Sequence, residues 1–72
     1  MENANFKNAG LWFVDFYSAN LTNADLSGAD LRNAFLDNAD LSNANLEGAD
    51  LQDALLDGAI LNCLNHPVCL NG

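Results

Sequence analysis

Residues 19–43 read ANLTN-ADLSG-ADLRN-AFLDN-ADLSN, five consecutive pentapeptides that each begin with alanine and carry leucine at the third position. The same spacing begins at Ala4, and Val14 is the one replacement of the alanine. The central apolar residues of the twelve repeats are Phe6, Leu11, Phe16, Leu21, Leu26, Leu31, Leu36, Leu41, Leu46, Leu51, Leu56 and Leu61. Repetition over nearly the whole chain decides the architecture, because each tandem unit buries its apolar face against its neighbours.

A period of five residues fits neither a helix nor a flat strand. On an α-helix, five residues advance the side chain by about 140° beyond a full turn, so the apolar positions would spiral around every face. In a strand, a step of five would send successive leucines to opposite faces. Both apolar positions return to the inside only if the chain turns a corner within each repeat. The spacing therefore predicts a solenoid with stacked leucines in its interior.

The residues between the apolar positions support corners. They are mostly Asn, Asp, Gly and Ser, which favour turns because Asn and Asp bond their own backbone and Gly has no steric penalty. Alanine fits a tight interior position where a larger residue would overpack. An alanine-rich helix is the alternative interpretation, and the period argues against it.

Segments such as Ala24–Gly28 (ADLSG) and Ala39–Asn43 (ADLSN) resemble the A(D/N)LXX signature of the pentapeptide-repeat family, and the resemblance covers residues 4–63. It implies an all-β fold, a right-handed quadrilateral β-helix with four repeats per coil and about three coils. We accordingly expect repeats over residues 1–63 and a short cap over 64–72. Family members are known mainly as binding or regulatory proteins. Some mimic DNA and inhibit topoisomerases such as gyrase, whereas many, especially in cyanobacteria, have no assigned role or act in cell differentiation.

The chain is strongly acidic. Ten acidic residues oppose two basic ones, Lys7 and Arg32, for a net charge of −8. Direct nucleic-acid binding is disfavoured, because it needs clustered Lys and Arg. The acidity indicates either solubility or a surface for a basic partner. We therefore expect a non-enzymatic protein-interaction or regulatory module, with a DNA mimic as the alternative, although three coils would imitate only about half of the roughly 34 Å duplex turn.

With four repeats per coil, residues twenty apart should stack on the outside. Asp30 would then lie on Asp50, and Asp37 on Asp57. Like charges that lie directly opposite are destabilising, but water and salt make the effect small. These acidic pairs indicate either a solvated surface or a functional one.

Some outward positions carry apolar or aromatic residues instead. The residues are Phe35, Leu55, Ile60, Trp12, Phe13 and Tyr17. Phe35 and Leu55 are twenty apart and should form one apolar column, with Ile60 on the neighbouring face. Exposed apolar patches usually mark contacts, so we expect these residues to form an interface. For Trp12 and Phe13 the alternative is a cap over the N-terminal end of the stack.

The pattern ends after Leu61, and Pro67 lacks the N–H that a ladder would use. We expect Leu64, Val68 or Leu70 to cover the last coil. Cys63 and Cys69 could form a disulfide if their Cα atoms lie within about 7 Å, whereas a reducing cytoplasm would keep both thiols free.

We expect no metal, no cofactor and no catalytic residue. The spacing of Cys63, His66 and Cys69 supplies at most three metal ligands, and a filled solenoid has no pocket for a cysteine nucleophile. The start Met1-Glu2-Asn3 has neither a basic region nor an apolar run, so we expect a cytoplasmic protein without a membrane segment, or a module of a longer protein. The expected partner is another protein, with a homodimer as a further option.

Overall fold

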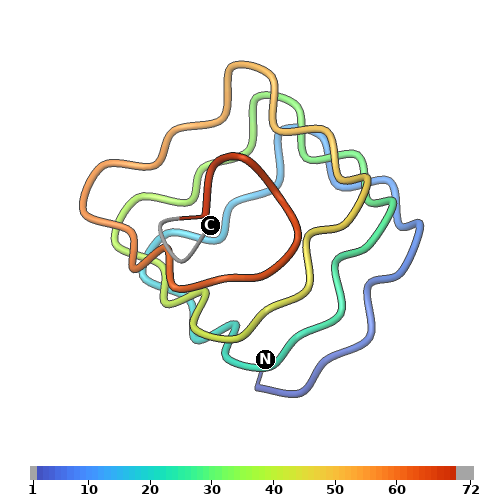
Figure 1. The fold of residues 1–72 in the computed structure, drawn as a ribbon. Helices are drawn as coiled ribbons and strands as arrows, with labels where there is room; N and C mark the ends of the chain where they lie inside the picture. The colour runs from blue at the N-terminus through green and yellow to red at the C-terminus, as the bar shows by residue number, and fades with distance from the viewer. Residues whose placement is uncertain (1, 70–72) are drawn as a thin grey trace.

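The computed structural model describes residues 2–69, which form stacked coils of a solenoid. Parallel bridges join residues twenty apart, from Asn5 and Asp25 in the first two coils to Asp40 and Ile60 further along. Because each repeat has five residues, this separation places four repeats in every coil. Seen down the stack, the coils have a roughly four-sided outline (Figure 1), and the molecule extends 24 × 24 × 22 Å.

The expected all-β helix is found only in part. Residues 2–69 contain no helix and no continuous strand, and every bridge is a single residue wide. The physical reason lies in the repeat itself. Each pentapeptide makes a turn, and only one residue remains in extended pairing before the next turn begins.

The five positions of a repeat have distinct roles, and we name them after the repeat Ala24–Gly28. They are the alanine position (Ala24), the bridge position (Asp25), the central position (Leu26), the first turn position (Ser27) and the second turn position (Gly28). Four of the five backbone N–H groups bond backbone carbonyls in the same coil or an adjacent one. The bonds of this stretch are Asp25 to Ala4 (2.9 Å), Leu26 to Asn45 (2.8 Å), Gly28 to Glu47 (2.8 Å) and Ala29 to Leu26 (3.1 Å).

The fifth N–H, at the first turn position, bonds a side chain. In eight repeats it donates to the Oδ1 atom of the Asp or Asn at the bridge position, over 3.0–3.2 Å. The pairs are Lys7–Asn5, Tyr17–Asp15, Thr22–Asn20, Ser27–Asp25, Arg32–Asp30, Ser42–Asp40, Glu47–Asn45 and Gln52–Asp50. This bond explains why Asp and Asn recur at the bridge position, because it completes the hydrogen bonding of the turn.

The second turn position has an unusual backbone conformation in every repeat up to Gly58. Its φ lies between 57° and 72° from Asn3 to Gly58, which is the left-handed region that the third residue of a type II turn requires. Asn, Asp, Ser and Gly occupy it, with Phe13 as the bulky exception. At Gly28 the requirement is also steric, because a Cβ there would collide with the side chain of Asn8 in the preceding coil.

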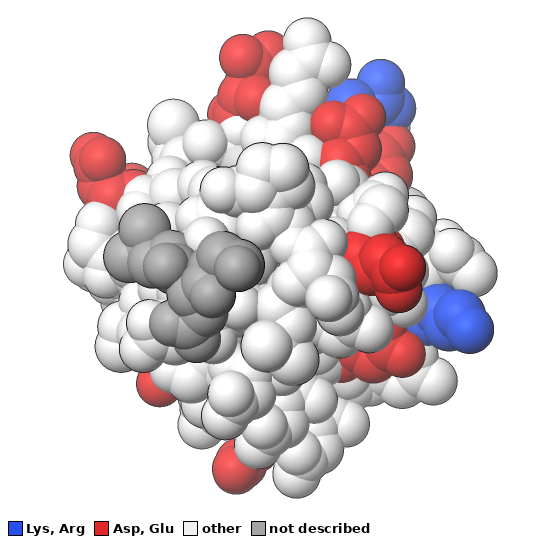
Figure 2. All heavy atoms as spheres, in the orientation of Figure 1, with Lys and Arg blue, Asp and Glu red and all other residues white. Residues whose placement is uncertain are grey.

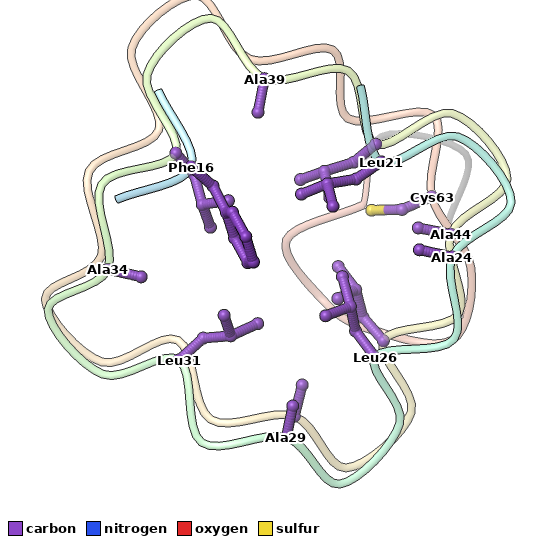
Figure 3. Close-up of a cluster of buried hydrophobic side chains, with 14 of the residues drawn as sticks. Phe16, Leu21, Ala24, Leu26, Ala29, Leu31, Ala34, Ala39, Ala44 and Cys63 are labelled. Carbon is purple, nitrogen blue, oxygen red and sulfur yellow. The ribbon is translucent and has the colours of Figure 1, made fainter. Parts of the chain in front are cut away.

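The core is the column of central and alanine side chains, as predicted. The central residues from Leu21 to Leu46 are fully buried, and the alanines from Ala24 to Ala44 are nearly so. Figure 3 shows the central side chains converging on the axis with the smaller alanines between them. At the two ends of the stack, side chains such as Leu11 and Leu56 are only half-buried.

The last coil is one residue shorter than the others. Asn45 pairs with Leu64 rather than with residue 65, so one turn residue is missing and Cys63 takes an alanine position. Figure 3 shows Cys63 in the same column as Ala24 and Ala44, and it is buried. The ladder thus continues one residue beyond Cys63.

The tail then folds back over the end of the stack. Cys63 and Cys69 form a disulfide with Cα atoms 5.1 Å apart, and Val68 packs half-buried against the core. The Nε2 atom of His66 lies 3.0 Å from the carbonyl oxygen of Ala49, and the N–H of Val68 donates to its Nδ1 atom. Val68 therefore has the covering role that we expected, whereas Leu64 is 42% exposed and Leu70 lies outside the described residues.

Candidate interaction face

One face of the solenoid differs from the other three. It consists of residues 14–18, 34–38 and 54–58, and we call it the groove face. Its bridge positions hold Asp15, Phe35 and Leu55, joined from coil to coil by parallel bridges. Phe35 is 41% exposed and Leu55 is 48% exposed. The structure thus places these two residues in the single outward column that their spacing predicted.

A shallow depression of about 420 Å³ lies on this face, and we call it the groove. Its lining residues are Asp15, Tyr17, Phe35, Asp37 and Leu55. The groove brings together four residues that the sequence singled out for different reasons. Phe35 and Leu55 belong to the apolar column, Tyr17 to the aromatic residues of the first coil, and Asp37 to the acidic pairs. Asp15 was missed, although its position twenty residues before Phe35 was a usable signal.

The apolar residues of the groove change the backbone hydrogen bonding beneath them. The N–H of Tyr17 donates to the Oδ1 atom of Asp15 over 3.0 Å. Phe35 and Leu55 have no such acceptor, so the equivalent N–H groups of Asp37 and Asp57 lack the side-chain bond found in eight other repeats. The groove face therefore combines apolar side chains, carboxylates and turn N–H groups that are free of this bond.

The other apolar candidates lie elsewhere. Ile60 pairs with Asp40 on the neighbouring face. Trp12 and Phe13 contact each other edge to face, with ring centroids 5.2 Å apart and an interplanar angle of 69°. Neither ring is among the half-buried side chains packed on the core, a group that includes Leu11 and Val14. The structure thus gives no support to the alternative of an N-terminal cap.

The predicted acidic pairs have different surroundings. Asp30 and Asp50 are bridged, but Arg32 donates to both carboxylate oxygens of Asp30, over 2.8 and 2.7 Å. This side-chain bond lowers the pKa of Asp30 and raises the pKa of Arg32. The groove face, by contrast, carries Asp37 and Asp57 without any basic residue.

Two further carboxylates are held by hydroxyl groups. Ser27 donates to Asp25 and Ser42 to Asp40, each from the hydroxyl over 2.6 Å. These side-chain bonds, followed by the backbone bonds from the same serines, lower the pKa of both aspartates.

Figure 2 shows acidic side chains around the rim of the end view, whereas the end itself is largely uncharged. At this end of the stack, the acidic side chains therefore lie on the sides of the solenoid.

The sequence model of the family described as pentapeptide repeats matches residues 1–23 and 24–62. The chain belongs to the pentapeptide-repeat family. This membership agrees with the A(D/N)LXX resemblance and with a β-helix type of fold. Among curated proteins, none matches the chain.

Solved structures of other pentapeptide-repeat proteins are similar to the chain. One, from the thylakoid lumen of Arabidopsis thaliana, is 42% identical over 83% of this chain and 46% of its own, with a TM-score of 0.58. Rfr23 from the cyanobacterium Cyanothece 51142 is 34% identical over 86% and 40%, with a TM-score of 0.37. HetL from Nostoc sp. strain PCC 7120, involved in heterocyst differentiation regulation, is 29% identical over 90% and 38%, with a TM-score of 0.35. The chain thus spans less than half the length of each, and the last two scores are too low to carry an argument.

The expectation of a cytoplasmic protein is wrong. The similar Arabidopsis protein comes from the thylakoid lumen, and the disulfide between Cys63 and Cys69 is itself atypical of a reducing cytoplasm. The residues Met1-Glu2-Asn3, on which that expectation rested, do not determine the compartment of the protein. Within residues 2–69, no helix is long and apolar enough to cross a membrane.

Proposed function

We propose that the chain is a non-enzymatic protein-interaction module that presents its groove face to another protein. The observation that carries this proposal is the exposed column of Phe35 and Leu55, at the bridge position where eight of the other repeats have Asp or Asn. Each replacement exposes apolar surface and removes the side-chain acceptor of a turn N–H. Both changes work against a freely solvated surface and favour a covered one.

The repeat architecture supports a binding role rather than a catalytic one. The single histidine, His66, has both ring nitrogens engaged in the C-terminal cap. The groove itself is lined by carboxylates, a phenol and apolar side chains. A regulatory role through binding, as membership of this family suggests, is consistent with these groove residues.

The alternative of a DNA mimic has less support. A mimic needs carboxylates spaced along a surface like the phosphates of a duplex, and on the groove face Phe35 and Leu55 interrupt the acidic residues. The largest dimension, 24 Å, is also shorter than one duplex turn of about 34 Å. An interaction with a protein surface uses both the apolar and the acidic parts of the groove.

A photo-crosslinking experiment tests the proposal. The photoreactive residue p-benzoylphenylalanine replaces Tyr17 in the full chain, inside the cells that express it. The matched control replaces Glu47, an exposed residue at the same first turn position on another face. We expect a discrete protein adduct from position 17 and none from position 47, because contact should be confined to the groove face.

Equal adducts from both positions would indicate nonspecific contact. The lack of any adduct from position 17, in cells where the protein is folded and abundant, would contradict the proposed role. The adduct mass also separates a second copy of the chain from a different protein.

A further inference from the structure

We propose that the groove binds an extended, basic segment of a partner protein. A bulky apolar side chain of that segment packs on Phe35 and Leu55, and Lys or Arg residues on either side of it pair with the carboxylates of the groove face. This inference rests on the proposed function and specifies the chemistry of the partner.

The apolar part of the groove fits one large side chain. Phe35 and Leu55 lie in adjacent coils and both line the groove, as does Tyr17, which is 62% exposed. The volume of about 420 Å³ is at the lower end of the range for ligand pockets. An aromatic or branched aliphatic residue that enters the groove removes exposed apolar surface from water on both partners.

The charges around the groove select the flanking residues. Asp15 and Asp37 line it, and Asp57 occupies the equivalent position one coil beyond Asp37. Both basic residues of the chain, Lys7 and Arg32, belong to repeats of other faces. Arg32 lies on the adjacent face but is already paired with Asp30 over 2.7 Å. The carboxylates of the groove face therefore attract complementary charge on a partner.

The same charges argue against a second copy as the occupant. Pairing two groove faces would bring three aspartates of one copy against three of the other. Such like-charge contact is unfavourable across an interface. The basic segment of a different protein satisfies the apolar column and the carboxylates together.

The backbone of the groove favours an extended occupant over a helical one. The N–H groups of Asp37 and Asp57 lack the side-chain bond that other repeats make. An extended peptide has carbonyl oxygens available to accept from them, whereas the carbonyls inside a helix are already bonded. Main-chain bonds of this kind accompany many complexes of extended peptides.

The test begins with random twelve-residue peptides displayed on phage and selected on the full, oxidised chain. We expect the enriched peptides to carry a bulky apolar residue between Lys or Arg residues. Synthetic versions are then titrated by fluorescence anisotropy. The variant Phe35→Asn/Leu55→Asn, which restores Asn at both bridge positions, should weaken binding by about tenfold or more.

The matched control is Ile60→Asn. Ile60 occupies the same bridge position on a neighbouring face and is 45% exposed, which is similar to Phe35 and Leu55. Because it lies outside the groove, its replacement should change the affinity by less than about twofold. A fall of the same size in both variants would contradict a site confined to the groove.

A second matched pair isolates the charge. Asp15→Asn and Asp50→Asn each remove one charge at an exposed bridge position and keep the Oδ1 acceptor for the turn N–H. We expect Asp15→Asn to weaken binding by about threefold and Asp50→Asn to have a smaller effect. Raising the salt from about 50 to 300 mM should weaken wild-type binding, because the carboxylates are solvent-accessible.

Three results would overturn the inference. Enriched peptides without basic residues, or no enriched peptides at all, would exclude the basic segment. Light scattering that shows a wild-type dimer and a monomer for Phe35→Asn/Leu55→Asn would assign the face to a second copy. If position 17 still crosslinks to a different protein in any of these cases, the proposed function stands and only the chemistry of the partner is wrong.

Discussion

The groove face and the face built from residues 4–8, 24–28 and 44–48 share one backbone but differ at the bridge position. The latter, which we call the polar face, has Asn5, Asp25 and Asn45 there, and all three accept the turn N–H. On the groove face only Asp15 does so. The coil-to-coil ladder is complete on both faces. The difference teaches that inward residues and turns specify this solenoid, whereas the bridge position accepts apolar residues without interrupting the ladder.

The sharpest test of this difference between inward residues and the bridge position uses two adjacent residues of one repeat. Leu36 is fully buried, whereas Phe35 beside it is 41% exposed. We expect Leu36→Ala to lower the free energy of unfolding by about 2–5 kcal/mol through lost burial and a cavity. Phe35→Ala should change it by less than about 1 kcal/mol. Urea unfolding followed by the fluorescence of Trp12 measures both, and similar losses would contradict this difference.

The C-terminal tail, unlike the repeats, is held by a covalent bond, the disulfide between Cys63 and Cys69. Reducing the disulfide between Cys63 and Cys69 should lower the free energy of unfolding by about 2 kcal/mol, because the unfolded chain regains the freedom of a short loop. The variant Cys63→Ala/Cys69→Ala is the control, since alanine suits the column that Cys63 occupies. It should match the reduced wild type and be insensitive to reductant. A reductant effect in this variant would mean that the bond is not its cause.

The second turn position allows a gain of stability. Phe13 has φ of 60° where the other repeats have Asn, Asp, Ser or Gly, and bulky residues are disfavoured in that region by roughly 1–2 kcal/mol. We expect Phe13→Asn to raise the free energy of unfolding by about 1 kcal/mol. Asn33→Phe, at the same corner one coil later, should lower it by a similar amount. If Phe13→Asn is destabilising, the contact with Trp12 outweighs the backbone strain.

The bridge position itself should show a gain of similar size. Phe35→Asn gives the N–H of Asp37 an acceptor, and one such hydrogen bond is worth about 0.5–1.5 kcal/mol. The reverse change, Asn20→Leu, removes the acceptor of both the N–H and the hydroxyl of Thr22 and should be destabilising by at least as much. Thermal unfolding of the two variants and of the wild type measures both changes in stability. A loss of stability in Phe35→Asn would mean that the exposed apolar column stabilises the isolated chain.

Much of this fold could be predicted from the sequence, because the information is local and repeated. The period placed the central residues inside, and the four repeats per coil implied by the family resemblance stacked Phe35 on Leu55. The side-chain bond at the bridge position could also have been found, since Asx turns are a known property of Asp and Asn. The shortened last coil could not, because it depends on tertiary contacts of the tail, such as His66 with Ala49. The groove needed the structure to join Tyr17 and Asp37 to the apolar column.

The smallest predicted effect concerns acid. The pKa values of Asp25, Asp30 and Asp40 are lowered from 3.8 by hydrogen bonds from Ser27, Arg32 and Ser42. Their stabilising contribution is therefore complete above about pH 4 and is lost as the pH falls through the lowered values. Asp25→Asn/Asp40→Asn keeps the turn acceptors but cannot titrate, so its thermal midpoint should fall less between about pH 4 and pH 2. Equal falls in both proteins would mean that these two carboxylates do not contribute to acid unfolding.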